Sequence, residues 1–282
     1  MAYTAEVSRQ NPSCILFLID QSGSMSDPFG GQSRKSKNKA ERLADAVNRL
    51  LFELSIRCTK DHNEGVRNYY DVGVIGYGTQ VGSALGGALK GRDLVPIREV
   101  ADNPARVDER TQKVEDGAGG LSEQTVKFPV WFDAVASGGT PMCQALRRAH
   151  TLLHTWVQAH PQSFPPIVIN ITDGEATDGE PRIPAQTLRQ LATNDGNLLL
   201  FNLHLSSHRG YPILYPDSDS GLPDEYAQQL FEMSSLLPSH IREAAQSKDY
   251  AVGSESRGFV FNADIVEVIQ FLDMGTRAKA LR

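Results

Sequence analysis

The sequence lacks the features of several protein classes. Its 282 residues include only three cysteines, Cys14, Cys58 and Cys143. This odd number with no close pair excludes a disulfide framework and a cysteine-ligated zinc ribbon, so we expect three buried, reduced thiols. Glycine (24 residues) and proline (15 residues) are near average, which excludes collagen-like and wholly disordered chains.

Long apolar runs are also absent. Residues 1–13 are polar and lack the ~7–15 apolar residues of a signal peptide, and no run approaches the ~18 residues of a membrane helix. These absences predict a cytoplasmic protein with no membrane partner. The formal charge of −6 argues against a nucleic-acid partner, because nucleic-acid binders usually carry a basic stripe that neutralises phosphates.

Short apolar segments alternate with amphipathic ones along most of the chain. Ser13–Asp20 is almost continuously apolar and ends in a carboxylate, as strands buried on both faces of a parallel sheet do. Further strands are expected at Tyr70–Tyr77, 166–172, 197–205 and 258–261. Apolar residues at helical spacing predict helices at 39–58, 141–160, 184–192, 224–236 and 263–274.

This alternation predicts an α/β, Rossmann-like fold with a mainly parallel central sheet and helices on both faces. The segment 84–133 departs from the pattern, because it sets short apolar pieces among charges. A structureless loop of that length is unusual, so we expect an insertion with some strand content. No linker or internal repeat interrupts the chain, which predicts one domain over residues 1–282 with its core at about 13–274.

Three loops carry oxygen donors at the ends of expected strands or the start of a helix. The first contains Asp20, Ser22 and Ser24, the second contains Thr140, and the third contains Asp173. Loops after parallel strands converge at one edge of the sheet, where ligands bind. Three hydroxyls and two carboxylates form an all-oxygen set, which suits Mg²⁺ or Mn²⁺ better than zinc.

These motifs, in this order, resemble the metal-ion-dependent adhesion site of von Willebrand factor A (vWA) domains, over about residues 13–274. The resemblance implies that Ser22, Ser24 and Thr140 contact the metal directly, while Asp20 and Asp173 act through water. It implies a non-enzymatic protein-binding module in which an acidic residue of a protein partner completes the coordination. Stand-alone bacterial members are often linked with protein kinases, phosphatases or MoxR-type ATPases, which suggests an adaptor in signalling or stress.

An enzyme is the main alternative, with Mg²⁺-dependent phosphoryl transfer or hydrolysis on the same sheet. The sequence has neither a phosphate-binding P-loop nor a Gly-x-Ser-x-Gly nucleophile turn. An aspartyl phosphatase would carry a second acid where Ser22 stands. A dinucleotide binder would carry Gly-x-Gly-x-x-Gly after the first strand, and this motif is missing too.

Other residues allow both a functional and a structural interpretation. Each of the five site residues has a structural alternative, a helix cap or turn. Glu175 and Asp178 support either a second cation or a solvated loop, and His150 and His154 have helical spacing but no zinc-protease pattern. The basic cluster 34–39 is a solvated loop or helix approach, or it steers an acidic partner toward the metal. Trp131 and Phe132 are core residues or a binding hot spot.

Overall fold

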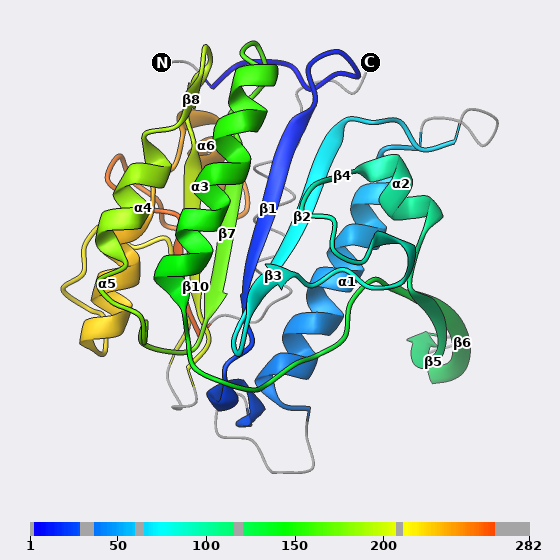
Figure 1. Cartoon of the computed structure of the whole chain (residues 1–282). Coiled ribbons are helices and arrows are strands. Elements are labelled where there is room, and N and C mark those ends of the chain that lie inside the picture. The colour runs from blue at the N-terminus through cyan, green and yellow to red at the C-terminus, as the bar shows by residue number, and fades with distance from the viewer. Residues whose placement is uncertain (1–2, 29–36, 60–64, 116–120, 207–210, 263–282) are drawn as a thin grey trace.

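The computed structural model describes residues 3–28, 37–59, 65–115, 121–206 and 211–262. Its central sheet contains eight strands in the order β11-β12-β10-β7-β1-β2-β3, with β4 paired to β2. The parallel strands are β1 (Ser13–Asp20), β2 (Tyr70–Tyr77), β7 (Ile167–Thr172), β10 (Leu199–His204) and β12 (Phe259–Phe261). The expected α/β class with a mainly parallel sheet is confirmed (Figure 1).

Antiparallel strands complete the edges of this sheet. They are β3 (Val81–Ser83) and β4 (Val95–Pro96), both on β2, and β11 (Ile213–Leu214) on β12. A separate two-stranded ladder joins β8 (Ala192–Thr193) and β9 (Gly196–Asn197). The 3₁₀ turns are η1 (Gly23–Ser26) and η3 (Gly87–Leu89).

Helices cover both faces of the sheet. One face packs against α1 (Lys39–Arg57), α2 (Ile97–Asp102) and α6 (Ser239–Gln246), and the other packs against α3 (Met142–Ala159), α4 (Arg182–Arg189) and α5 (Glu225–Met233). Strand β1 shows why two cores form. Ile15, Phe17 and Ile19 belong to the first core and alternate with residues of the second, because successive strand side chains point to opposite faces.

The expected elements match the described ones closely, apart from their ends. The helix expected at 184–192 is wrong at both ends, since α4 starts and ends earlier, and those expected at 141–160 and 224–236 are shorter. The helix expected at 263–274 lies outside the described residues. Within the described parts of the chain, none of the helices is both long and apolar enough to cross a bilayer.

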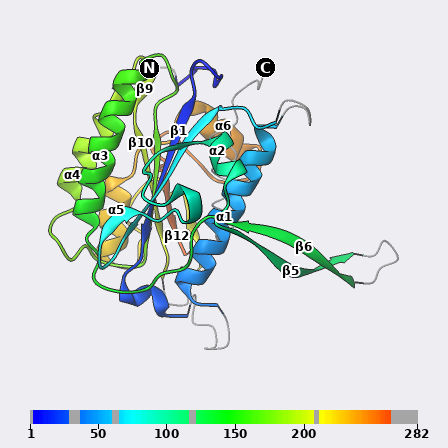
Figure 2. The same ribbon diagram turned by 45° about the vertical axis from the view of Figure 1, so that its right-hand side comes forward.

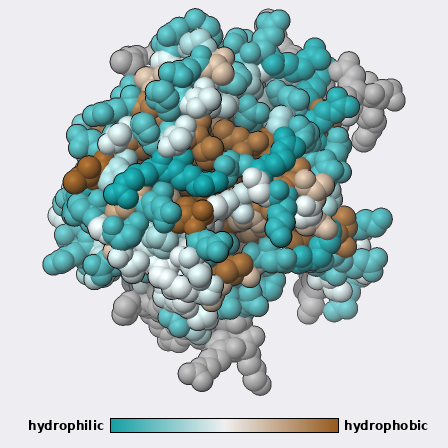
Figure 3. All heavy atoms as spheres, in the orientation of Figure 1, coloured by the Kyte–Doolittle hydropathy of each residue, from teal (hydrophilic) through white to brown (hydrophobic). Residues whose placement is uncertain are grey.

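The segment 84–133 does contain strands. Besides η3, β4 and α2, it forms a hairpin of β5 (Arg106–Glu115) and β6 (Leu121–Val130), which are paired antiparallel along their full lengths. Figure 2 shows this hairpin projecting from the body beside α1. The surface facing the viewer in Figure 3 is mostly hydrophilic, with hydrophobic side chains in separate patches.

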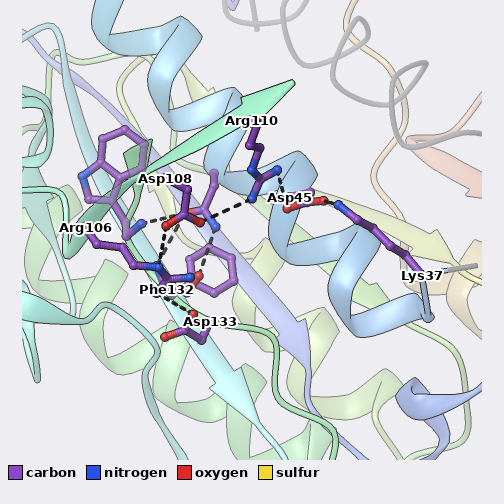
Figure 4. A network of polar contacts seen from close by, with 9 residues as sticks. Lys37, Asp45, Arg106, Asp108, Arg110, Phe132 and Asp133 are labelled. Carbon is purple, nitrogen blue, oxygen red and sulfur yellow. Dashed lines mark hydrogen bonds and ion pairs between the residues drawn. The ribbon is translucent and has the colours of Figure 1, made fainter. Parts of the chain in front are cut away.

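Contacts to α1 hold the base of the hairpin. Arg110 pairs with Asp45 at 2.8 Å, and Asp45 also pairs with Lys37 (Figure 4). The buried amide of Asn48 accepts a hydrogen bond from the backbone N–H of Trp131 at 2.8 Å and donates one to the carbonyl of Phe132 at 3.0 Å. Both aromatic side chains are buried in the core, which supports their structural interpretation.

Candidate functional site

The carboxyl ends of the parallel strands lie at the bottom of Figure 1. From β1 the chain continues to β2 on one side, whereas β7 pairs with β1 on the other. The strand order therefore reverses at β1. The loops that follow β1 and β7 therefore lead to opposite faces of the sheet. Ligands of α/β sheets bind between two loops that separate in this way. Asp20 ends β1, and Asp173 directly follows β7.

Both oxygens of the Asp20 carboxylate are held by neighbouring groups. Oδ1 accepts the backbone N–H of Ser22 at 2.8 Å, and Oδ2 accepts the hydroxyl of Thr172 at 2.6 Å. Burial raises the pKa of Asp20 above its ordinary value, while hydrogen bonds from Ser22 and Thr172 act to lower it. These bonds fix the side chain in one orientation at the strand end.

A chain of hydrogen bonds continues from this carboxylate to the loop after β7. The hydroxyls of Ser22 and Ser24 are 3.0 Å apart, and Ser24 Oγ donates to Asp173 Oδ1 at 2.8 Å. Ser22 is buried, whereas Ser24 is exposed to solvent. The structure thus brings together four of the five residues predicted from the sequence, with one of them accessible.

The loop that carries Thr140 packs against the same turn through its backbone. Ser137 N–H donates to the carbonyl of Gln21 at 2.6 Å, and Gly23 N–H donates to the carbonyl of Gly138 at 3.0 Å. Among the described residues, the Thr140 hydroxyl makes no hydrogen bond, although its backbone pairs with Thr177 in both directions at 2.9 Å. The loop that carries Thr140 is therefore bonded to the turn that carries Ser22 and Ser24.

Two glycines allow this close packing of loops. Gly138 has φ +87°, which favours glycine, and a Cβ there would lie 2.5 Å from the backbone nitrogen of Thr79. A Cβ on Gly139 would lie 2.9 Å from Thr177 Oγ1. Side chains at these two positions would separate the Thr140 loop from its neighbours.

Lys39 is the residue at this site that the sequence interpretation missed. Its Nζ lies 2.7 Å from Asp173 Oδ2, and the two side chains are 2% and 1% exposed. Lys39 begins α1, as the helix-approach interpretation of 34–39 has it, but it is buried, so the solvated interpretation is wrong for this residue, and steering of a partner stays a prediction. Lys37 is exposed and pairs with Asp45, and residues 34–36 lie outside the described residues. The sequence shows only that this lysine directly precedes an apolar helical stretch, and nothing in it pairs Lys39 with Asp173.

A row of buried polar side chains lies beneath the site. Tyr77 donates to Asn170 Oδ1 at 2.7 Å, and Asn170 donates to Asn202 Oδ1 at 2.9 Å. Burial raises the pKa of the Tyr77 hydroxyl, as does the charge of Asp20. Burial lowers the pKa of nearby His204, while the charge of Asp224 opposes this shift. These hydrogen bonds fix strands β2, β7 and β10 relative to one another below the loops.

The remaining candidate residues have structural partners. Asp178 accepts the backbone N–H groups of Cys143 and Gln144 at 3.0 and 2.8 Å, which caps the start of α3, and Glu175 accepts from Tyr226 at 2.9 Å. His150 and His154 stack at 6.0 Å between ring centroids. Within the described ranges, no three His, Cys, Asp or Glu side chains cluster in a way that would hold a metal. All three cysteines are buried and free.

The donor set nevertheless fits a small hard cation. Around an octahedral Mg²⁺ with bonds of about 2.1 Å, neighbouring oxygens lie about 2.9 Å apart. The hydroxyl oxygens of Ser22 and Ser24, two of the three expected direct ligands, are 3.0 Å apart. A cation of this size therefore matches a spacing that these side chains already have, and the uncommitted Thr140 hydroxyl is the remaining donor of the predicted set.

No protein-family model matches the chain, and no curated protein matches it. Among solved structures, the vWF domain of the type V pili tip protein Mfa5 from Porphyromonas gingivalis is 8% identical, with a TM-score of 0.46, and the alignment covers 97% of this chain and 99% of that one. The manganese-loaded TRAP protein of Plasmodium vivax is 14% identical, with a TM-score of 0.44 and coverage of 95% and 74%.

Proximal thread matrix protein 1 from the mussel byssus is 13% identical, with a TM-score of 0.42. The alignment covers 80% of this chain but only 42% of the mussel protein, so the chain spans less than half of that protein's length. Because all three TM-scores are below 0.5, these likenesses carry no argument about function.

Proposed function

We propose that this chain is a vWA domain with a metal-ion-dependent adhesion site, a non-enzymatic module that binds an acidic residue of a protein partner through Mg²⁺ or Mn²⁺. The observation that carries the proposal is the chain of hydrogen bonds that joins Asp20, Ser22, Ser24 and Asp173 across two loops. A structural helix cap needs one such side chain, whereas here four converge at the edge of the sheet where ligands bind.

Each residue has a distinct role in this proposal. The hydroxyls of Ser22, Ser24 and Thr140 are the direct ligands, and Asp20 and Asp173 act through water. Thr172 and the Ser22 backbone orient Asp20, because they occupy its two oxygens. The bound cation supplies a positive centre with an open position for a carboxylate. Because Ser24 is exposed, a cation held by its hydroxyl would be accessible to a carboxylate from solvent.

The same contacts favour binding over hydrolysis. A phosphoryl-transfer enzyme on this sheet would use Asp20 as its nucleophile, yet both oxygens of that carboxylate accept hydrogen bonds from the protein. A cytoplasmic adaptor working with a kinase, a phosphatase or a MoxR-type ATPase stays a prediction from the resemblance.

Thermal unfolding in chelator and across a Mg²⁺ and Mn²⁺ titration tests the proposal. A cation that binds only the folded state adds about 2.7 kcal/mol of stability at one hundred times its dissociation constant. We expect wild type to gain stability and Asp20→Ala to gain none. Asp27→Ala is the matched control, because it removes an exposed carboxylate from the same loop and should respond like wild type. An equal response of wild type and Asp20→Ala would refute the site.

A further inference from the structure

The ion pair of Lys39 and Asp173 places a positive charge inside the proposed metal site. Lysine is rarely buried unless it is paired, and here the ammonium contacts Asp173 Oδ2 while Ser24 donates to the other oxygen of the same carboxylate. The lysine thus touches a residue that the proposed function assigns to metal binding. It contributes charge where a metal site would be expected to hold only oxygen donors.

The start of α1 holds Lys39 in this position. Asn38 caps the helix, with its side chain accepting from Glu41 N–H and its own N–H donating to the Glu41 carboxylate. The backbone N–H of Lys39 donates to the carbonyl of Asp27 at 3.1 Å, which ties the first turn of α1 to the turn after β1. The contact with Asp173, 134 residues away in sequence, is therefore built on a fixed backbone.

Stability alone gives a weak reason for this arrangement. Removing two charges from water is costly, and replacing a buried ion pair by apolar residues is often neutral or stabilising. The charge balance offers a stronger reason. Asp20, Asp173 and Lys39 together carry a formal charge of −1, so a divalent cation brings the site to +1. Without the lysine, the loaded site would be neutral.

We propose that Lys39 is a built-in counter-cation, which weakens binding of the divalent metal and leaves the loaded site positive, so that it attracts the carboxylate of a partner. This inference rests on the proposed function and assigns Lys39 as a residue that determines which ligands bind. Positive charge near a site disfavours a second cation and favours an anion by Coulomb's law, most strongly where water is excluded. Lys39 thus lowers the affinity of the site for the metal and raises the affinity of the metal-loaded site for the partner's carboxylate.

Lys39→Gln tests the inference, because it removes the charge while its amide keeps a hydrogen-bond donor for Asp173. Calorimetric titration with Mn²⁺ should give a dissociation constant at least tenfold lower than that of wild type. Acetate, a minimal carboxylate, reports the second effect through broadening of its methyl proton signal by protein-bound Mn²⁺. Its affinity for the loaded variant should fall at least threefold.

Two further variants are matched controls. Lys37→Gln removes the same charge from an exposed side chain two residues away and should leave both affinities within twofold of wild type. Lys39→Arg keeps the charge and should retain stronger acetate binding than Lys39→Gln. If Lys39→Gln folds only with metal present, it is prepared in Mn²⁺ and the acetate measurement decides.

The outcomes separate the inference from the proposed function. If wild type binds Mn²⁺ and Lys39→Gln binds it equally well or more weakly, the inference is overturned but the proposed function is not. The same holds if the acetate affinity of the Mn²⁺-loaded variant is unchanged. Failure of both proteins to bind Mn²⁺ overturns the proposed function. If Lys39→Gln binds Mn²⁺ and wild type does not, the lysine ammonium occupies the place of the metal in the natural protein. This outcome overturns both the metal-dependent function and the proposed role of Lys39 in capturing a carboxylate at a metal-loaded site.

Discussion

The buried ion pair gives a sharp prediction about stability without metal. Replacing Lys39 by Met leaves Asp173 as a charged group with 1% exposure and Ser24 as its remaining side-chain donor. Breaking a buried pair from one side costs about 3–5 kcal/mol. Since the Ser24 hydrogen bond remains, we expect the free energy of unfolding of Lys39→Met in chelator to fall by about 3 kcal/mol.

A double-mutant cycle measures the pair itself. Asp173→Asn should also destabilise, because it leaves the ammonium without its counter-charge. The double variant Lys39→Met/Asp173→Asn removes both charges and should lose less than the sum of the single losses. We expect a coupling energy of about 2 kcal/mol, within the range of roughly 0.5–3 kcal/mol seen for residues in direct contact.

Urea unfolding followed by circular dichroism, in chelator throughout, gives the four free energies. Lys37→Met is the control, because its side chain is 58% exposed, and exposed ion pairs contribute at most about 1 kcal/mol. Additivity of the two single losses within about 0.5 kcal/mol would show that Lys39 and Asp173 do not interact, and would refute the reasoning.

Three further predictions test other parts of the molecule. Asn48→Ala leaves the buried backbone groups of Trp131 and Phe132 without this partner and should lower the free energy of unfolding by about 3 kcal/mol. Urea unfolding measures this loss, and a loss smaller than about 0.5 kcal/mol would contradict the prediction. Thr140→Ala should weaken capture of acetate by the Mn²⁺-loaded protein more than it weakens Mn²⁺ binding, and equal losses would argue against its proposed role. Burial raises the pKa of the Cys58 thiol to about 12, whereas an unfolded cysteine titrates near 8.5. The unfolded state therefore loses this proton first as the pH rises, so the free energy of unfolding should fall by about 1.4 kcal/mol per pH unit above roughly pH 9 for this thiol. Cys58→Ala should flatten that slope, and an unchanged slope would mean that the thiol is not buried.

The sequence predicts the central strands well because their burial is unambiguous. Strands β1 and β2 have the predicted ends, since each is a short apolar run with buried neighbours on both faces. Helix α3 is found within one residue of its predicted ends for a similar reason, because eight of its residues are buried. By contrast, α6 was not predicted, because Ile241 and Ala245 are its only buried residues and so give little periodic signal.

Local sequence patterns predict neither the β5–β6 hairpin nor the ion pair of Lys39. Strands β5 and β6 form an arm away from the main sheet, and charged residues recur along β5, so no alternation of apolar and polar residues marks them. Four of the five site residues are joined as their loops predict. The pairing of Lys39 with Asp173 depends on how α1 sits against the loop after β7, and no spacing along the sequence contains that information.

Direct counting of bound Mn²⁺ tests the central claim most simply. The electron paramagnetic resonance signal of free Mn²⁺ gives the bound fraction at known total metal and protein concentrations. The proposed function predicts one site per chain in wild type, loss of that site in Ser22→Ala/Ser24→Ala, and full retention in Asp27→Ala. Binding that persists in the double serine variant, or no binding by folded wild type, would contradict it.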